Sequence, residues 1–110
     1  MEQNCIDVDT LKRLIDHDKS DIELIDVRSP SEFLENHIEG SKHIPIDKIL
    51  KNPLDILEMF KASSSPIYFI CRTHGRSATA VNQLQMLGLQ KAFYVRGGIS
   101  AWIASGYSTT

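Results

Sequence analysis

The sequence has few cysteines, almost no net charge and no long apolar run, and each absence excludes a class of protein. Its 110 residues carry a formal net charge of -2 and include only two cysteines, Cys5 and Cys71. A charge so close to zero provides no global basic field to hold nucleic acid or an anionic membrane surface. No apolar stretch approaches the roughly 20 residues that span a bilayer. We therefore expect neither nucleic acid nor a membrane as a partner.

Two cysteines are too few for a disulfide framework, and the sequence also lacks metal-ligand spacing. Neither cysteine belongs to a Cys-x-x-Cys pair, and the four histidines show no paired ligand spacing (His17, His37, His43 and His74). We predict no metal site and no cofactor. The first residues lack the basic and apolar regions of a signal peptide, so we expect a cytoplasmic protein with reduced thiols. Cys5 is then a small structural residue, and a resolving thiol for Cys71 is the alternative.

Segments typical of strands alternate with segments typical of helices along the chain. A chain of 110 residues can bury one core, so we predict a single domain over residues 1–110. Strands are predicted at residues 22–27, 42–45, 67–70 and 92–95, and helices at 11–17, from Pro30, at 49–60 with a break at Asn52-Pro53, at 77–87 and at 99–104. This alternation favours an α/β fold with a mostly parallel sheet covered on both faces.

The most informative stretch follows the strand predicted at 67–70. That strand is apolar without alternation, which is typical of a strand buried on both faces. Cys71 comes directly after it, and a helical apolar pattern runs from Ser77 to a stop at Gly88. The segment from Cys71 to Ser77 is therefore predicted to be the loop that joins the strand to the helix.

A loop in this position is suited to binding anions. Its backbone N–H groups point into one small space, at the positive end of the helix dipole. A cysteine that faces them would be stabilised as the thiolate, and Arg72 and Arg76 add positive charge. Because the thiolate is the nucleophile, Cys71 is the predicted catalytic residue.

Residues at two other predicted strand ends should meet this loop. Asp26 and Arg28 lie at the carboxyl end of the strand at 22–27, and Gly97 and Gly98 follow the strand at 92–95. In parallel sheets, ligands bind outside the carboxyl ends of the strands. We expect Asp26 and Arg28 to pair with each other and to support the site without reacting. The two glycines are expected to permit a tight turn before the last helix.

Polar residues mark where two of the helices should begin. Ser29, Pro30 and Glu32 have the pattern of an N-cap, a proline at the first helical position and a capping box. Asp9 or Thr10 is expected to cap the first helix.

Four motifs, taken together, resemble the single-domain rhodaneses, which are sulfurtransferases that carry sulfur on a cysteine as a persulfide. The motifs are Asp26-Val27-Arg28 with Glu32-Phe33, His37-Ile38-x-Gly40-Ser41 running into Ile44-Pro45, Cys71-Arg72 through Arg76-Ser77, and Gly97-Gly98-Ile99-x-Ala101-Trp102. They span most of the chain in the family's order. The resemblance implies one rhodanese-like domain, with a five-stranded parallel sheet flanked by helices on both faces.

The resemblance also implies a mechanism. The Cys71 thiolate attacks the outer sulfur of a donor such as thiosulfate and keeps that sulfur as a persulfide. A thiophilic acceptor, cyanide or a thiol, then takes it, so the partners are a small-molecule donor and acceptor. The residues expected to bind the persulfide and the donor anion are Arg72, Thr73, His74, Gly75, Arg76 and Ser77. The alternative is a sulfur carrier or interaction module whose donor is a protein persulfide.

The spacing between Cys71 and the second arginine of the loop differs from that of a related class of enzymes. Cysteine phosphatases related to this fold place an arginine six positions after the cysteine, where this chain has Ser77. Arg76 stands one position earlier, which indicates a smaller ring and argues against a phosphatase. Arg76 either contacts the donor or pairs with a carboxylate.

His74 occupies the place of a usual glycine in this loop, and a positive φ there would cost little. His74 is either a solvent-facing residue or a participant that charges near neutral pH.

Overall fold

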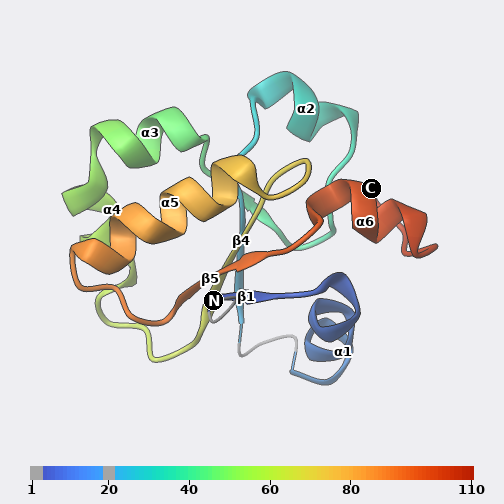
Figure 1. Ribbon diagram of the computed structural model, residues 1–110, viewed down its shortest axis with the longest axis horizontal. Helices are drawn as coiled ribbons and strands as arrows, with labels where there is room; N and C mark the ends of the chain where they lie inside the picture. Colours follow the sequence, from blue (N-terminus) through green and yellow to red (C-terminus); the bar gives the residue numbers. More distant parts are fainter. Residues whose placement is uncertain (1–3, 19–21) are drawn as a thin grey trace.

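Strands and helices alternate along the chain as predicted (Figure 1). The structure, a computed structural model, describes residues 4–18 and 22–110. The strands are β1 (Cys5–Ile6), β2 (Glu23–Asp26), β3 (Lys42–His43), β4 (Ile67–Ile70) and β5 (Ala92–Val95). The helices are α1 (Val8–Asp18), α2 (Pro30–Glu35), α3 (Ile46–Lys51), α4 (Pro53–Phe60), α5 (Gly75–Met86) and α6 (Gly98–Ala104). In these two ranges, no helix has the length and apolarity needed to cross a bilayer.

The five strands form one sheet in the order β1-β5-β4-β2-β3, and every pairing is parallel. The central strand β4 pairs with β2, where Asp26 lies opposite Ile70, and with β5, where Phe69 lies opposite Tyr94. Parallel pairing brings the carboxyl ends of β2, β4 and β5 to the same edge of the sheet. The predicted five-stranded α/β fold is therefore confirmed.

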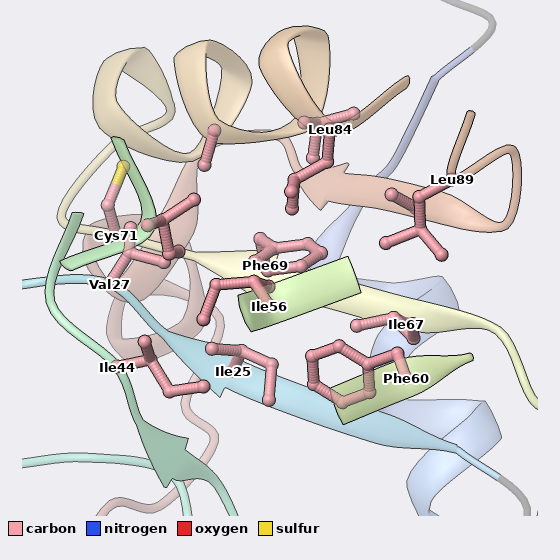
Figure 2. Packing of buried hydrophobic residues seen from close by; sticks show 14 residues of the cluster. Ile25, Val27, Ile44, Ile56, Phe60, Ile67, Phe69, Cys71, Leu84 and Leu89 are labelled. Atoms are coloured by element: carbon pink, nitrogen blue, oxygen red, sulfur yellow. The ribbon is translucent and has the colours of Figure 1, made fainter. Parts of the chain in front are cut away.

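The side chains of β4 alternate between two cores, one on each face of the sheet. Ile67 and Phe69 pack on the face covered by α3, α4 and α5 (Figure 2). Tyr68 and Ile70 pack on the opposite face, where α1 and α6 contribute residues that include Trp102. This double burial explains why the strand is apolar throughout, and it confirms that helices flank both faces.

The structure confirms the predicted start of α2 and corrects that of α1. Ser29 caps α2 in a full capping box with Glu32. In α1, however, Asp7 is the capping residue, because its Oδ1 accepts a hydrogen bond of 2.8 Å from the backbone N–H of Thr10. This hydrogen bond also lowers the pKa of the Asp7 carboxyl. The prediction of Asp9 or Thr10 was wrong because the buried Val8 already belongs to the first helical turn.

Candidate active site

Cys71 lies where β4 ends and its side chain turns toward α5. Figure 2 shows Cys71 at one end of the core, with its sulfur pointing toward the start of α5. The residue is only 1% exposed. The backbone N–H of Ser77 donates to Sγ at 3.4 Å, and the Ser77 hydroxyl lies 3.3 Å from the same sulfur. The sulfur therefore has polar partners at the N-terminus of a helix, which is the positive end of the helix dipole.

The helix α5 begins at Gly75, two residues earlier than predicted. Gly75, Arg76 and Ser77 form its first turn, so the connecting loop is shorter than the seven residues expected. The prediction placed the boundary by apolar periodicity, which starts only where the helix meets the core. The consequence for the site is favourable, because the N–H of Ser77 that reaches Sγ belongs to the first helical turn, at the positive end of the dipole.

Two carbonyl groups of the loop, those of Cys71 and Arg72, are held by the start of α6. The N–H of Ile99 donates to the Cys71 carbonyl at 2.9 Å, and the N–H of Ser100 donates to the Arg72 carbonyl at 3.0 Å. In a trans peptide the N–H points opposite to the C=O. The N–H groups of Arg72 and Thr73 therefore point away from α6. Within the described ranges, none of the N–H groups from Arg72 to Arg76 has an acceptor, which leaves them available to an anion.

Gly98 is the residue that lets α6 approach the loop so closely. A Cβ atom at this position would lie 2.3 Å from the carbonyl oxygens of both Cys71 and Thr73. Gly98 also has a φ of 58°, in the left-handed region that favours glycine. The sequence predicted a tight turn at Gly97 and Gly98, which is confirmed, but it did not reveal that Gly98 packs against the loop that follows Cys71.

His74 occupies the place of the usual glycine without adopting a positive φ. Its φ is -161°, which is extended, so the positive φ considered for this position does not occur. Its exposed ring lies 6.3 Å from the ring of Tyr94, measured between centroids. His74 thus stands at the open side of the loop, on the β5 side of the site.

Arg76 pairs with Glu32 of α2. Its two terminal nitrogens donate to the two carboxylate oxygens at 2.6 and 3.0 Å, in the fork geometry that gives arginine its specificity for carboxylates. Glu32 also accepts from the N–H of Ser29 at 2.9 Å. The hydrogen bonds from Arg76 lower the pKa of the Glu32 carboxyl to about 2. Of the two roles predicted for Arg76, the structure therefore favours the pair with a carboxylate.

Asp26 and Arg28 form the buried pair that the sequence predicted. The Arg28 Nη2 atom lies 2.8 Å from Asp26 Oδ2, and both side chains are almost fully buried. Arg28 also donates to the side-chain oxygen of Asn36 at 3.3 Å and to the Asn36 backbone carbonyl. This network fixes the far end of α2 against β2, at the same edge as the loop.

Aromatic stacking on Phe33 also holds α2 in place. The ring of Phe33 is stacked on His37 at 3.8 Å and on His43 at 4.5 Å between centroids, with interplanar angles of 8° and 13°. Two nearly parallel rings this close to Phe33 must lie on its opposite faces. Since α2 has no buried residue of its own, these stacks and the ion pairs are what position Glu32 beside the loop.

Cys5 lies in β1, half-buried, as the structural interpretation predicted. The strand order places β5 between β1 and β4, so Cys5 and Cys71 are at least two strand spacings apart, about 9 to 10 Å or more. A disulfide requires Cα atoms within about 7 Å. The Sγ atom of Cys5 instead contacts Arg96 Nη1 at 3.4 Å. This arrangement argues against Cys5 as a resolving thiol for Cys71.

In the described part of the chain, no group of three or more His, Cys, Asp or Glu side chains is placed to hold a metal ion. The groups described above at this edge of the sheet are a thiol, the amides of the loop and two ion pairs.

The chain matches the family model of the rhodanese-like domain over residues 7–105. A sulfurtransferase of Allochromatium vinosum is 32% identical over 103 residues, which cover 94% of this chain and 91% of that protein. The putative sulfur carrier protein YrkF of Bacillus subtilis is 30% identical over 97 residues, which cover 88% of this chain and 49% of that protein. A crystal structure of a rhodanese-related protein from Thermoplasma volcanium aligns with a TM-score of 0.79 and 34% identity, covering 97% of each chain.

The chain spans between 49% and 60% of the length of the first curated relatives that it matches. Two of the relatives are named for sulfur carriage and for sulfur transfer; the first extends well beyond the matched region, and the second is covered over 91% of its length.

Proposed function

Because this chain belongs to the rhodanese-like domain family, as its match over residues 7–105 shows, we propose that it is a sulfurtransferase whose Cys71 carries sulfur as a persulfide. The observation that carries the proposal is the position of Cys71 Sγ, 3.4 Å from the N–H of Ser77 at the start of α5. A relative named as a sulfurtransferase, matched over nearly its whole length, gives independent support.

The first step loads the cysteine. The Cys71 thiolate attacks the outer sulfur of a donor such as thiosulfate, and a new sulfur–sulfur bond forms at Sγ. The bond inside the donor breaks, and its electron pair leaves with sulfite. The outer sulfur of the resulting persulfide carries charge, which the unpaired N–H groups of the loop would stabilise as an oxyanion hole does.

The two arginines of the loop have different roles in this proposal. Arg72 is exposed and, among the described residues, has no carboxylate partner, so it would attract the donor anion. Arg76 is held by Glu32 and would fix the first turn of α5. A phosphatase needs an arginine that is open to the phosphoryl group. The pairing of Arg76 therefore argues against that activity.

The loaded cysteine then passes its sulfur to a thiophilic acceptor, cyanide or a thiol, which restores the thiolate. A transfer in two half-reactions predicts ping-pong kinetics. The test is the intact mass of the protein after incubation with thiosulfate. We expect the gain of one sulfur atom, its removal by cyanide, and no gain in Cys71→Ser. A wild-type mass that stays unchanged would overturn the proposal for thiosulfate.

A second candidate is a sulfur carrier that receives its sulfur from a protein persulfide. It is favoured by the likeness to a protein named as a putative sulfur carrier. The same mass measurement separates the candidates. A carrier of this type would gain sulfur from a persulfidated protein donor but not from thiosulfate.

A further inference from the structure

A groove lies between α2 and α6, directly beside the catalytic loop. Its volume is about 290 Å³, at the small end of the range for ligand pockets. Its lining includes Arg28, Glu32 and Glu35, then Arg72, and from α6 Ile99 and Ile103. We call it the α2–α6 groove. A donor such as thiosulfate or an acceptor such as cyanide would fill only a fraction of this volume.

Two of the four charged groups in the groove are already neutralised. The guanidinium of Arg28 is paired with the buried Asp26, and the carboxylate of Glu32 is paired with Arg76. Arg72 and Glu35 are both exposed, and neither has an ion-pair partner within residues 4–18 and 22–110. The groove therefore offers one cation and one anion to a ligand. Beside them lies the apolar side chain of Ile103, which is about half exposed.

Residues that line the groove contact the loop beside Cys71 on two sides. Arg72 directly follows Cys71, and the N–H of Ile99 donates to the Cys71 carbonyl at 2.9 Å. On the other side, Glu32 is bonded to Arg76, the neighbour of the Ser77 that contacts Sγ. A molecule in the groove would thus lie against the same loop that holds the proposed persulfide.

We propose that the α2–α6 groove binds the sulfur acceptor, and that this acceptor is a zwitterionic thiol of the size of an amino acid or a short peptide. Its carboxylate pairs with Arg72, its ammonium group pairs with Glu35, and its apolar atoms lie on Ile103. This inference rests on the proposed function, because it assigns the acceptor of the persulfide on Cys71. The inference is also compatible with two half-reactions. Arg72 binds the donor anion in the first, and it is free to bind the acceptor in the second because the anionic product of the donor has left.

The transfer step balances without an added oxidant or reductant. The acceptor thiol loses its proton to solvent, and its thiolate attacks the outer sulfur of the Cys71 persulfide. One sulfur–sulfur bond forms to the acceptor, and the bond between Sγ and the outer sulfur breaks. The electron pair of that bond returns to Sγ, so the products are an acceptor persulfide and the Cys71 thiolate.

The experiment measures single-turnover discharge of the loaded protein. The protein is loaded with excess thiosulfate, the donor is removed, and loss of the persulfide mass is followed with each of five thiols. Cysteine and cysteinylglycine carry both charges, N-acetylcysteine carries the anion, cysteamine carries the cation, and β-mercaptoethanol carries neither. Rates are compared per thiolate, because thiols of different pKa differ in reactivity.

The variants Arg72→Gln and Glu35→Gln remove one charge each. Relative to discharge to β-mercaptoethanol, we expect Arg72→Gln to slow discharge of the persulfide to cysteinylglycine and to N-acetylcysteine by about fivefold. Glu35→Gln should slow discharge to cysteinylglycine and to cysteamine by about the same factor. Arg72→Gln is loaded for longer, so that discharge always starts from equal persulfide. Arg13→Gln and Glu58→Gln remove the same charges from exposed helical positions outside the groove, and they should leave these ratios unchanged.

The possible failures can be told apart. A protein that gains no sulfur mass from thiosulfate or from a persulfidated protein donor overturns both the proposed function and this inference. If the persulfide forms, but each substitution changes the rate of discharge by the same factor for all five thiols, this inference alone is overturned. If that uniform response is joined by slower discharge of the two variants to reduced thioredoxin, the groove binds a protein acceptor instead of a small thiol.

Discussion

Cys71 and Cys5 face the same side of one sheet, and only one of them has the surroundings of a reactive site. Tyr94 pairs with Cys5 and packs on the same core as Cys71, which places both thiols on the face covered by α5. Cys71 stands at the central strand, against the first turn of α5. Cys5 stands in the edge strand β1, with Arg96 as a contact.

The difference between the two cysteines does not lie in the presence of a nearby cation. Each cysteine has an arginine in its neighbourhood, but only Cys71 faces an N–H group at the start of a helix and lies in a loop of unpaired amides. A guanidinium beside Cys5 is open to solvent and screened, whereas amides fixed by α6 and α5 keep their orientation during the reaction. We conclude that the backbone arrangement, more than side-chain charge, distinguishes the proposed site.

The largest expected effect comes from removing each thiol in turn. Cys71→Ser should abolish transfer of sulfur from thiosulfate to cyanide while leaving the fold intact, since the two side chains are nearly isosteric. Cys5→Ser should keep wild-type transfer, because Cys5 lies outside the loop. Turnover assays with circular dichroism of both variants provide the check. A large loss of turnover in Cys5→Ser would remove the contrast drawn between the two cysteines.

The second prediction disturbs the backbone around Cys71 without touching its side chain. Gly98→Ala should lower turnover by more than about tenfold, because the new Cβ would overlap the carbonyls of Cys71 and Thr73 and push the loop from α6. It should also destabilise the fold by about 2 kcal/mol or more.

The matched control is Gly40→Ala. Gly40 has a φ of 88°, but a Cβ there meets nothing within 4 Å. It should therefore lose about 1 to 2 kcal/mol of folding free energy through its backbone and keep its turnover. Denaturant unfolding and initial rates measure both quantities. Equal turnover in the two variants would show that the approach of α6 does not organise the loop.

The third prediction loosens α5 from α2. Glu32→Gln keeps an oxygen for the capping box but loses the charge that holds Arg76. We expect kcat to fall by about three- to tenfold while the persulfide still forms, because a less fixed first turn positions Ser77 less well. Glu23→Gln, which breaks the exposed pair with Lys42 elsewhere on β2, serves as the control. Wild-type kcat in Glu32→Gln would mean that the ion pair does not position the loop.

The smallest expected effect is on stability in acid. The folded pKa of Glu32 is about 2, below its usual value of 4.5, so its contribution is complete above about pH 4.5. The contribution is lost as the pH falls from there through about 2. Because the pair is partly exposed, it should amount to no more than about 1 kcal/mol.

Urea unfolding of wild type and Glu32→Gln, from pH 7 down to pH 3, measures this contribution. The difference in unfolding free energy between the two proteins should shrink as the pH falls. A difference that stays constant across this range would show that the charge of Glu32 does not stabilise the fold.

Much of this arrangement could be predicted from local sequence. The unbroken apolar run of β4 indicated a strand buried on both faces, and the order of strands and helices indicated a parallel sheet. Those two inferences place Cys71 at the edge where ligands bind. The pairing of Asp26 with Arg28 and the capping box of Ser29 were also accessible, because their partners are only two or three residues apart.

What could not be predicted depends on contacts between distant segments. Glu32 and Arg76 are 44 residues apart, and no local pattern indicates that they meet. The closeness of Gly98 to the carbonyls of Cys71 and Thr73 likewise appears only when α6 folds back on the loop. The start of α5 was placed too late because its exposed first residues carry no apolar periodicity. The pattern Gly97-Gly98 was the one available signal for a close backbone approach.

The central claim is that sulfur resides on Cys71 and not on Cys5, and mapping the modified residue tests it most directly. The protein is treated with thiosulfate, alkylated and digested, and the cysteine peptides are identified by mass spectrometry. We predict one additional sulfur on the peptide that contains Cys71 and none on the peptide that contains Cys5. Additional sulfur on Cys5, or equal amounts on both peptides, would contradict the account.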